Sequence, residues 1–436
     1  MSRAGAAGGA AARQAVEPPS PGTATASGAA AFRESAAARR IGTCRALEPG
    51  PMLICIGSLH GNEPAGTLAL ERVIASLQSP GASRRALFRG DVVALRGNIR
   101  ALARDVRFMD EDMNRVWGRA RVAKLLATIR ETEKRRQAGS PPLPPDLGPT
   151  AEALEQLSLL TEVRAEVRRA RGPVCVLDLH TTSSESVPFS TLTDTLQNRK
   201  LAVMLGLPAV LGIEEALRGL MPHYFDRLGW PSLGVEGGRH RAAGSVPALE
   251  RVTWATMAAL NMVPAGEVAK ATAPFPEGCD RLPRFMEVRY RHSIKPSDEF
   301  KMEPGYDNFT PVKRGQPIAG DRNGVVRAPM SGRLLMPLYQ RLGEDGFFVV
   351  RPVKPIWLTF SRILRNAGAH RLATWLPGVR RHPDRTDAAL LAPVARTRPI
   401  MGALHLLGYH ARLDGDQAIA IRREGLVPDP RLNPLN

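Results

Sequence analysis

A histidine and a glutamate lie three residues apart in a short loop, His60-Gly61-Asn62-Glu63. A tight loop that contains glycine allows both side chains to face a single point. A neutral imidazole and a carboxylate are ligands that a catalytic zinc ion accepts. The same four residues also fit an ordinary polar loop, so the pair alone does not assign a metal site.

A second imidazole follows a run of apolar residues, in the sequence Asp178-Leu179-His180. Asp178 lies two residues before His180, on the same face of an extended strand. Its carboxylate could therefore orient the imidazole ring from behind. The alternative is a histidine at a strand end that is held in a hydrogen-bonded turn.

A lone acid, Glu236, follows the apolar residues 231–235 and precedes two glycines. It is a candidate general base, and the alternative is a surface glutamate in a flexible turn. If His60, Glu63 and His180 hold a metal, a fourth position stays open for water and Glu236 supplies a separate carboxylate. These groups together meet the minimum requirement of metal-assisted hydrolysis.

The segment 107–115 mixes arginines, acids and an asparagine around apolar positions. Arg115 offers a planar fork for a substrate carboxylate, and Asn114 adds hydrogen bonds. Arg107 could face a carbonyl oxygen on which negative charge develops. The alternative is a surface turn closed by salt bridges.

Short apolar runs separated by helical patterns must position these residues. They predict an α/β fold with a central, mixed, mainly parallel sheet flanked by helices. The catalytic side chains are expected at the carboxyl ends of the strands, where open α/β sheets bind ligands. The expected strands are 52–56, 91–95, 174–179, 209–211 and 231–235, and the expected helices are 67–77, with Thr67 as N-cap, and 201–205.

Composition divides the chain into four parts. Residues 1–40 form an Ala/Gly/Pro-rich tail that we expect to be disordered. We expect residues 41–282 to form the α/β domain that carries the catalytic candidates, with a helical insertion at about 117–171 in which helices 122–136 and 151–169 flank a proline-rich breaker at 140–145. Residues 283–354 form a smaller all-β domain, and residues 355–436 an Arg-rich, partly helical extension with 12 Arg and 6 acids.

The chain has 436 residues and a formal net charge of +18, from 60 Lys+Arg and 42 Asp+Glu. That charge alone suggests a polyanion partner. However, the basic residues are spread along the chain, and aromatic residues make up only 5%, so we do not expect a nucleic-acid partner. No apolar stretch reaches the roughly 18–20 residues of a membrane span, so we expect no membrane partner. Four scattered cysteines favour a reducing, cytoplasmic location.

The ordered set of residues resembles the succinylglutamate desuccinylase/aspartoacylase family, a branch of the zinc-carboxypeptidase-like fold. The set runs from His60-x-x-Glu63 through Arg107, the motif Asp112-Met113-Asn114-Arg115 and His180 to Glu236. The likeness covers about residues 50–350 and is nearest to uncharacterised bacterial members. Five elements in the family's order are far more specific than any one of them.

The resemblance implies a role for each matched residue. His60, Glu63 and His180 match the ligands of one zinc ion per chain. Glu236 matches the acid that activates water and then protonates the leaving amine, and Arg107 matches the arginine that polarises the scissile carbonyl. Asn114 and Arg115 match the pair that binds the substrate carboxylate, with Asp112 as a supporting acid behind them.

The sequence departs from the family in two places. Aspartoacylases have an arginine about ten residues before the catalytic acid, where this chain offers Arg227. The residues after Glu236 also differ, and His240 is the notable side chain there. Both are expected as substrate-binding candidates.

The β-rich region contains Ala328-Pro329-Met330-Ser331-Gly332, which looks like the turn of a biotinyl or lipoyl carrier domain. No lysine stands in the following hairpin, so we do not expect covalent attachment of a cofactor. The resemblance implies instead that this domain narrows the mouth of the active site.

The expected function is zinc-dependent hydrolysis of the amide bond of a small, anionic N-acyl amino acid. The alternatives on the same site are a carboxypeptidase, a peptidoglycan-fragment amidase or an esterase. A more distant alternative is a basic binding protein with a vestigial site. The sequence leaves the oligomeric state, the acyl group and the amino acid open.

Overall fold

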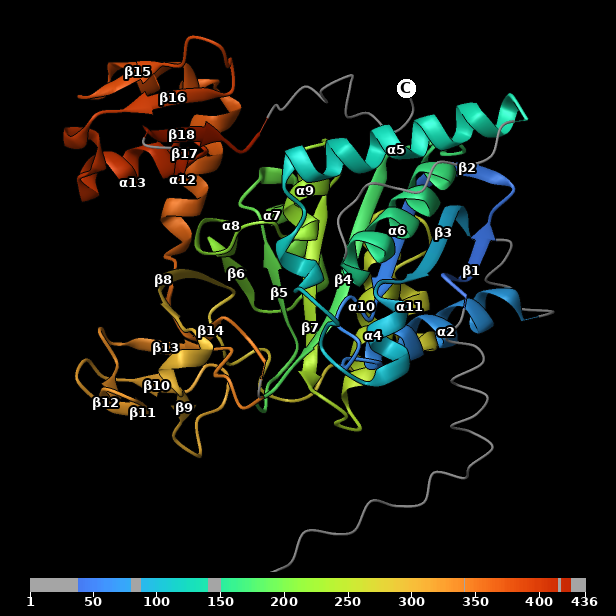
Figure 1. Ribbon diagram of the computed structural model, residues 1–436, viewed down its shortest axis with the longest axis horizontal. Coiled ribbons are helices and arrows are strands. Elements are labelled where there is room, and N and C mark those ends of the chain that lie inside the picture. Colours follow the sequence, from blue (N-terminus) through green and yellow to red (C-terminus); the bar gives the residue numbers. More distant parts are fainter. Residues whose placement is uncertain (1–37, 80–87, 140–149, 341, 415–416, 425–436) are drawn as a thin grey trace, which may run out of the picture.

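The computed structural model describes residues 38–79, 88–139, 150–340, 342–414 and 417–424 (Figure 1). Of the tail predicted at 1–40, residues 1–37 lie outside the described residues, as does the breaker at 140–145. Arg39 and Arg40 are described: Arg39 pairs with Glu155, and the first strand begins at Arg40. None of the described helices is both long and apolar enough to cross a membrane.

In the described residues, eleven strands form one sheet in the order β1-β3-β2-β4-β7-β5-β6-β8-β14-β13-β10. Its centre is parallel and consists of β3 (Arg89–Arg96), β2 (Glu48–Gly57), β4 (Val174–Thr182) and β7 (Ser232–Arg239). β1 (Arg40–Arg45) adds an antiparallel edge next to β3. The sheet is therefore mixed with a parallel core, as the sequence predicts.

The other half of the sheet leads into the β-rich region. β5 (Phe189–Leu192) runs antiparallel to β7, whereas β6 (Ala209–Leu211) and β8 (Phe285–Ser293) run parallel to one another. The remaining strands are antiparallel: β14 (Asp345–Pro352), β13 (Gly332–Leu335) and β10 (Pro311–Val312). Hydrogen bonding thus continues from the central strands into the β-rich region.

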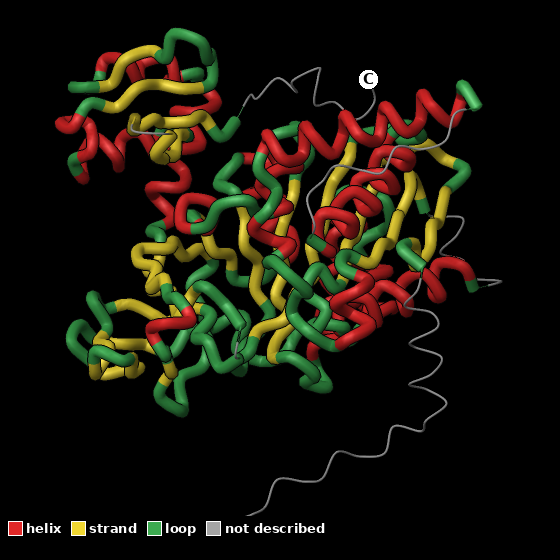
Figure 2. The backbone as a smooth tube through the Cα atoms, in the orientation of Figure 1, coloured by secondary structure: helices red, strands yellow, loops and turns green. Residues whose placement is uncertain are grey.

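Helices cover both faces of the central sheet (Figure 2). Alternate residues of β2 belong to different cores, because successive side chains of a strand point to opposite faces. Leu53 and Cys55 pack in the cluster that contains α2 (Ala65–Gln78), α7 (Leu196–Leu205), α10 (Ser245–Ala259) and α11 (Gly266–Ala271). Ile54 and Ile56 pack in the cluster that contains α5 (Arg119–Gln137), α6 (Ala151–Val167) and α9 (Met221–Asp226).

The predicted start of the first long helix is wrong by two residues. α2 begins at Ala65, with Pro64 at the N-cap position, and Thr67 lies inside the helix. As an interior residue Thr67 does not cap the helix, and its hydroxyl lies 2.7 Å from the hydroxyl of Ser58. That contact ties the helix to the loop that follows β2.

The β-rich region also contains a small antiparallel sheet of β12 (Gly324–Arg327), β11 (Pro317–Asp321) and β9 (Lys301–Met302). The first part of the chain contains two short α-helices, α4 (Ile99–Arg104) and α8 (Ile213–Ala216). It also contains two 3-10 helices, η1 (Met113–Arg115) and η2 (Pro296–Asp298).

The Arg-rich extension forms a C-terminal module with its own hydrophobic cluster. Beyond the helices that the sequence predicts, it contains a four-stranded antiparallel sheet in the order β15-β16-β18-β17. Its elements are α12 (Pro355–Asn366), η3 (Ala369–Trp375), β15 (Val379–Arg381), β16 (Ala388–Leu391), η4 (Pro393–Arg396), α13 (Arg398–Leu406), β17 (Tyr409–Asp414) and β18 (Gln417–Arg422).

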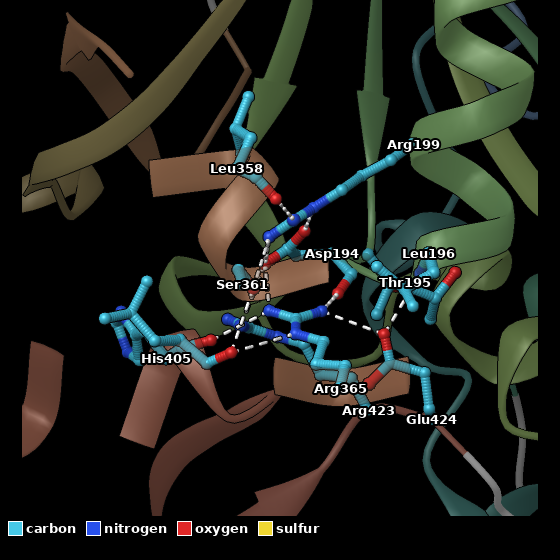
Figure 3. A network of polar contacts seen from close by, with 12 residues as sticks. Asp194, Thr195, Leu196, Arg199, Leu358, Ser361, Arg365, His405, Arg423 and Glu424 are labelled. Carbon is cyan, nitrogen blue, oxygen red and sulfur yellow. Dashed lines mark hydrogen bonds and ion pairs between the residues drawn. The ribbon is translucent and has the colours of Figure 1, made fainter. Parts of the chain in front are cut away.

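Buried ion pairs connect this module to the α/β domain near β5 and α7 (Figure 3). Asp194 follows β5 and pairs with Arg365 of α12 at 2.9 Å and with Arg423 at 3.2 Å. Arg199 of α7 pairs with the same carboxylate, and Glu424 accepts a hydrogen bond from Arg365 at 2.8 Å. The three guanidinium groups hold the pKa of Asp194 well below its usual range, although burial alone would raise that pKa.

Candidate metal site and active-site cavity

The loop that follows β2 turns sharply to bring His60 and Glu63 together. The backbone N–H of Glu63 donates to the carbonyl of His60 at 3.1 Å, which closes the turn. Gly61 faces the backbone of Ala101 so closely that a Cβ would lie 2.1 Å from the Ala101 carbonyl carbon. Only glycine fits at this position, and the loop conformation that the sequence suggests is therefore enforced by packing.

Glu63 lies between two imidazole rings. Its Oε1 is 3.0 Å from Nδ1 of His60, and its Oε2 is 3.0 Å from Nδ1 of His180. The three side chains are buried, and one ligand atom from each lies within 4.8 Å of the others. The structure thus brings together the three residues that the sequence predicts as metal ligands.

The other nitrogen of each ring, Nε2, lies close to a second carboxylate. Nε2 of His60 is 3.0 Å from Oδ1 of Asp112, and Nε2 of His180 is 2.8 Å from Oδ2 of Asp178. The Asp112 contact is a hydrogen bond, which favours a proton on Nε2 of His60 and leaves Nδ1 available to a metal. Nε2 of His180 and the Asp178 carboxylate lie close together but form no hydrogen bond among the described residues. Two imidazole nitrogens and a carboxylate that face one another are a donor set that fits zinc.

The electrostatics of the three groups are strongly linked. Burial alone would raise the pKa of Glu63, but His60 and His180 hold it well below the usual range. Burial would likewise lower the pKa of His180, but the carboxylates of Asp178 and Glu63 raise it well above its ordinary value. The site therefore favours a negative Glu63 with positive charge next to it.

Glu236 projects from β7 beside the ligand on the neighbouring strand. In the parallel register of β4 and β7, Glu236 lies opposite His180. Both residues lie inside their strands rather than after them, because the two strands extend further than the sequence predicts. The Oε2 atom of Glu236 is buried and finds no hydrogen-bond partner among the described residues. Burial raises the pKa of Glu236 to about 8.

Arg107 lies between two acids of the site. Its guanidinium donates to Asp112 at 2.9 Å and lies 3.4 Å from Oε1 of Glu63. Burial alone would lower the pKa of Arg107, but Asp112 and Glu63 raise it. The fixed positive charge is therefore held next to the candidate metal ligands.

The motif after Arg107 forms η1. Asp112 caps this turn, since its Oδ1 accepts from the backbone N–H of Asn114 at 2.8 Å. Asn114 accepts from the backbone N–H of Met221 at 2.9 Å, and Arg115 donates to Asp345 at 2.9 Å. Asn114 and Arg115 both line the cavity, as a carboxylate-binding pair would require.

A cavity of about 130 Å³ joins the candidate ligands, Glu236 and the substrate-binding candidates. One wall comes from the β-rich region and includes Met336, Leu338 and Phe348. The cavity is also lined by residues around α8 and α9, including Glu214 and His223. A small cavity with an apolar wall and several polar groups fits a small-molecule substrate.

The structure separates the two remaining substrate-binding candidates. His240 lines the cavity, with Nδ1 2.8 Å from the hydroxyl of Thr181 and Nε2 3.3 Å from Oε1 of Gln340. Arg227 is not among the residues that line the cavity, and its guanidinium lies 3.5 Å from Asp387 of the C-terminal module.

Two residues of the β-rich region join the site without being expected from the sequence. Gln340 contacts His240 and accepts a hydrogen bond from Asn62 at 3.1 Å. Asp345 begins β14 and binds Arg115. No local motif marks either residue. Gln340 and Asp345 lie more than 200 residues in sequence from their partners Asn62 and Arg115, and only the fold brings them to the site.

Comparison with known proteins agrees with this architecture. Residues 49–140 match the family model described as the succinylglutamate desuccinylase/aspartoacylase catalytic domain. A search of curated proteins gives no match. A solved succinylglutamate desuccinylase/aspartoacylase from Rhodobacter sphaeroides shares the fold, with a TM-score of 0.51 and 18% identity over 71% of this chain and 88% of that one.

Two further solved structures are similar to a smaller degree. The ectoine utilization protein EutE (DoeB) from Ruegeria pomeroyi has a TM-score of 0.48 and 15% identity, covering 71% of this chain and 87% of that one. The succinylglutamate desuccinylase from Chromobacterium violaceum has a TM-score of 0.44 and 17% identity, covering 70% of this chain and 86% of that one.

Proposed function

Taking the chain as a member of the succinylglutamate desuccinylase/aspartoacylase family, whose catalytic-domain model it matches over residues 49–140, we propose that it is a zinc-dependent deacylase. It hydrolyses the amide bond of a small, anionic N-acyl amino acid. The proposed location is the cytoplasm.

The observation that supports this proposal most strongly is the arrangement of His60, Glu63 and His180. Both Nδ1 atoms lie 3.0 Å from the Glu63 carboxylate, and both Nε2 atoms contact a second carboxylate. A cluster of salt bridges with a purely structural role does not require a second carboxylate near the Nε2 atom of each ring. This pattern is typical of histidines that bind a metal through the nitrogen facing the site.

When bound by these residues, zinc supplies Lewis acidity, which lowers the pKa of a water molecule toward about 7 and polarises a carbonyl oxygen. Glu236 accepts the proton of the attacking water on its Oε2 atom and delivers it to the nitrogen of the leaving amine. Burial raises the pKa of Glu236 to about 8, which suits the proton-delivering step; the positive charge of a bound metal would lower this pKa and so favour the ionised form that accepts the proton. Arg107 presents its guanidinium to the negative charge that develops on the carbonyl oxygen.

Arg115 and Asn114 orient the substrate by its carboxylate. Arg115 already binds one carboxylate, that of Asp345, at 2.9 Å, so its fork is directed at an acid. A substrate carboxylate bound to Arg115 and Asn114 would place the acyl amide toward the candidate zinc ligands. The wall of Met336, Leu338 and Phe348 limits the length of the substrate.

The alternative on the same site is a carboxypeptidase, a peptidoglycan-fragment amidase or an esterase, since a peptide C-terminus also carries a carboxylate. The small cavity and the contacts of Gln340 with Asn62 and His240 favour the short substrate. The test is hydrolysis by the zinc-loaded protein of a panel of N-acyl amino acids and peptides, measured by amine release, and of esters, measured by acid release. Cleavage of the peptides alone would replace the proposal with the peptidase alternative.

A further inference from the structure

The helix that opens the C-terminal module has its apolar face directed outward. Ile356, Phe360 and Ile363 of α12 recur at helical spacing and therefore share one face. Their exposed fractions are 69%, 45% and 56%, and Trp357 beside them is 53% exposed. Large apolar side chains that gather on one exposed helix face mark a surface that contacts something else.

The polar face of the same helix is used inside the protein. Ser361 and Arg365 lie on roughly the opposite side of α12 and are buried. Ser361 donates to the carbonyl of Leu406 at 2.9 Å, and Arg365 binds Asp194 of the α/β domain (Figure 3). The helix cannot rotate without breaking these buried contacts, so its apolar face is held toward solvent.

The turn η3, which follows α12, also exposes large apolar side chains. η3 packs against α12 and also against β15. It adds Leu372 and Trp375, of which Trp375 is 82% exposed. Tryptophan combines a large apolar ring with an N–H donor, and it is enriched where an apolar phase meets water.

The charged side chains that this segment itself contributes all have one sign, although Glu287 of β8 lines the same pocket as Trp357 and Lys354. Residues 354–383 contain six basic residues and no Asp or Glu. Five of the six are exposed, and none of these five forms an ion pair with a described acid; they are Lys354, Arg362, Arg371, Arg380 and Arg381. An apolar face with tryptophans and unpaired basic residues around it complements the surface of an anionic lipid bilayer.

We propose that α12 and η3 form a lipid-docking surface, by which the protein binds peripherally to an anionic phospholipid bilayer. The side chains of Ile356, Trp357, Phe360, Ile363 and Trp375 enter the region between head groups and acyl chains, and the basic residues face the head groups. The expectation of no membrane partner rested on the lack of a long apolar stretch, which a surface-bound helix does not need.

The proposal is tested by sedimenting the full-length protein with vesicles. One set consists of phosphatidylcholine alone, and the other of equal parts of phosphatidylcholine and phosphatidylglycerol. We expect the protein to sediment with the anionic vesicles only, with a blue shift of tryptophan emission that is diminished in Trp357→Phe. Replacing two of the exposed apolar side chains, Phe360→Ser with Ile363→Ser, should lower the partition coefficient by about 100-fold, since each such side chain contributes about tenfold.

Matched controls separate docking from general effects. Val325→Ser removes an exposed valine from β12, outside the lipid-docking surface, and should leave vesicle binding unchanged. Arg362→Gln and Arg371→Gln should each weaken binding by about fivefold. Because all these side chains are exposed, the variants should keep the thermal unfolding midpoint of the wild-type protein.

Three results would overturn the proposal. One is equal binding to both kinds of vesicle, which would remove the role of the basic residues. Another is undiminished binding by the Phe360→Ser, Ile363→Ser variant. The last is a dimer in analytical ultracentrifugation that this variant dissociates, without vesicle binding by the wild type, since a second copy would then cover the surface.

Discussion

Asp112 contacts His60 from behind: its Oδ1 lies 3.0 Å from Nε2 of the ring, while Nδ1 of the same ring faces Glu63 at 3.0 Å. The acid therefore fixes both the orientation of the imidazole and the position of its proton. Arg107 and His60 in turn hold the pKa of Asp112 well below its usual range, although burial would raise it. Asp112 is thus kept ionised and able to act on the ring.

The first prediction concerns this carboxylate. Asp112→Asn should weaken zinc binding by about 10–100-fold, because the loss of an orienting carboxylate has that typical effect. Competition with a chelating dye measures the dissociation constant. The matched control is Asp110→Asn, since Asp110 binds the backbone N–H of Ala151 and not the ring. Equal zinc affinities for the two variants would contradict the assignment.

A second prediction separates proton transfer from metal binding. Glu236→Gln keeps the size of the side chain but cannot accept a proton, so kcat should fall by about 10²–10⁴-fold. The zinc content of the variant should remain that of the wild type, because Glu236 is not one of the three clustered ligand candidates. Wild-type turnover by this variant would remove Glu236 from the mechanism.

The carboxylate-binding arginine leads to a third prediction. Arg115→Lys replaces a planar fork by a point charge, so KM for an N-acyl amino acid should rise by about tenfold while kcat changes less. Arg121→Lys is the matched control, because Arg121 pairs with Glu111 and does not line the cavity. Steady-state kinetics measure both constants. An unchanged KM in Arg115→Lys would show that the substrate is held elsewhere.

A fourth prediction concerns pH and the attachment of the C-terminal module. His405 of α13 lies 3.3 Å from Glu215 and 3.6 Å from Glu287. Burial alone would lower the pKa of His405, but the two carboxylates raise it to about 9. Since this folded value exceeds the unfolded value of about 6.5, the stabilisation is complete below pH 6.5 and is lost as pH rises through about 9.

His405→Gln should therefore lower the thermal unfolding midpoint of the protein at pH 6 but much less at pH 10. His382→Gln serves as the control, because His382 forms no ion pair with the described acids and should show no such dependence. A difference between wild type and His405→Gln that stays constant over this range would contradict the role of the two carboxylates.

Much of the site could be predicted from the sequence because its residues come directly after short, mainly apolar runs. The runs before His60, His180 and Glu236 are short and wholly buried, so their order in the chain placed the side chains at one end of a parallel sheet. The exact strand ends were less predictable. His180 and Glu236 lie within strands, since pairing between β4 and β7 continues past the last apolar residue.

Other features depend on contacts between distant segments. The hydroxyl of Thr67 contacts Ser58 instead of capping its helix, and the partner of Arg115 is Asp345, 230 residues away. The sheet of the C-terminal module was missed because its strands are short, as in β15 (Val379–Arg381), and show little alternation. Neither propensity nor spacing encodes such pairings.

The measurement that tests the central claim most directly is amine release from N-acyl amino acids before and after removal of zinc. We predict one zinc ion per chain in the active protein, loss of hydrolysis when a chelator strips it, and recovery when one equivalent is restored. We also predict that His180→Ala neither binds zinc with wild-type affinity nor recovers activity. Undiminished hydrolysis by the metal-free protein would contradict the account.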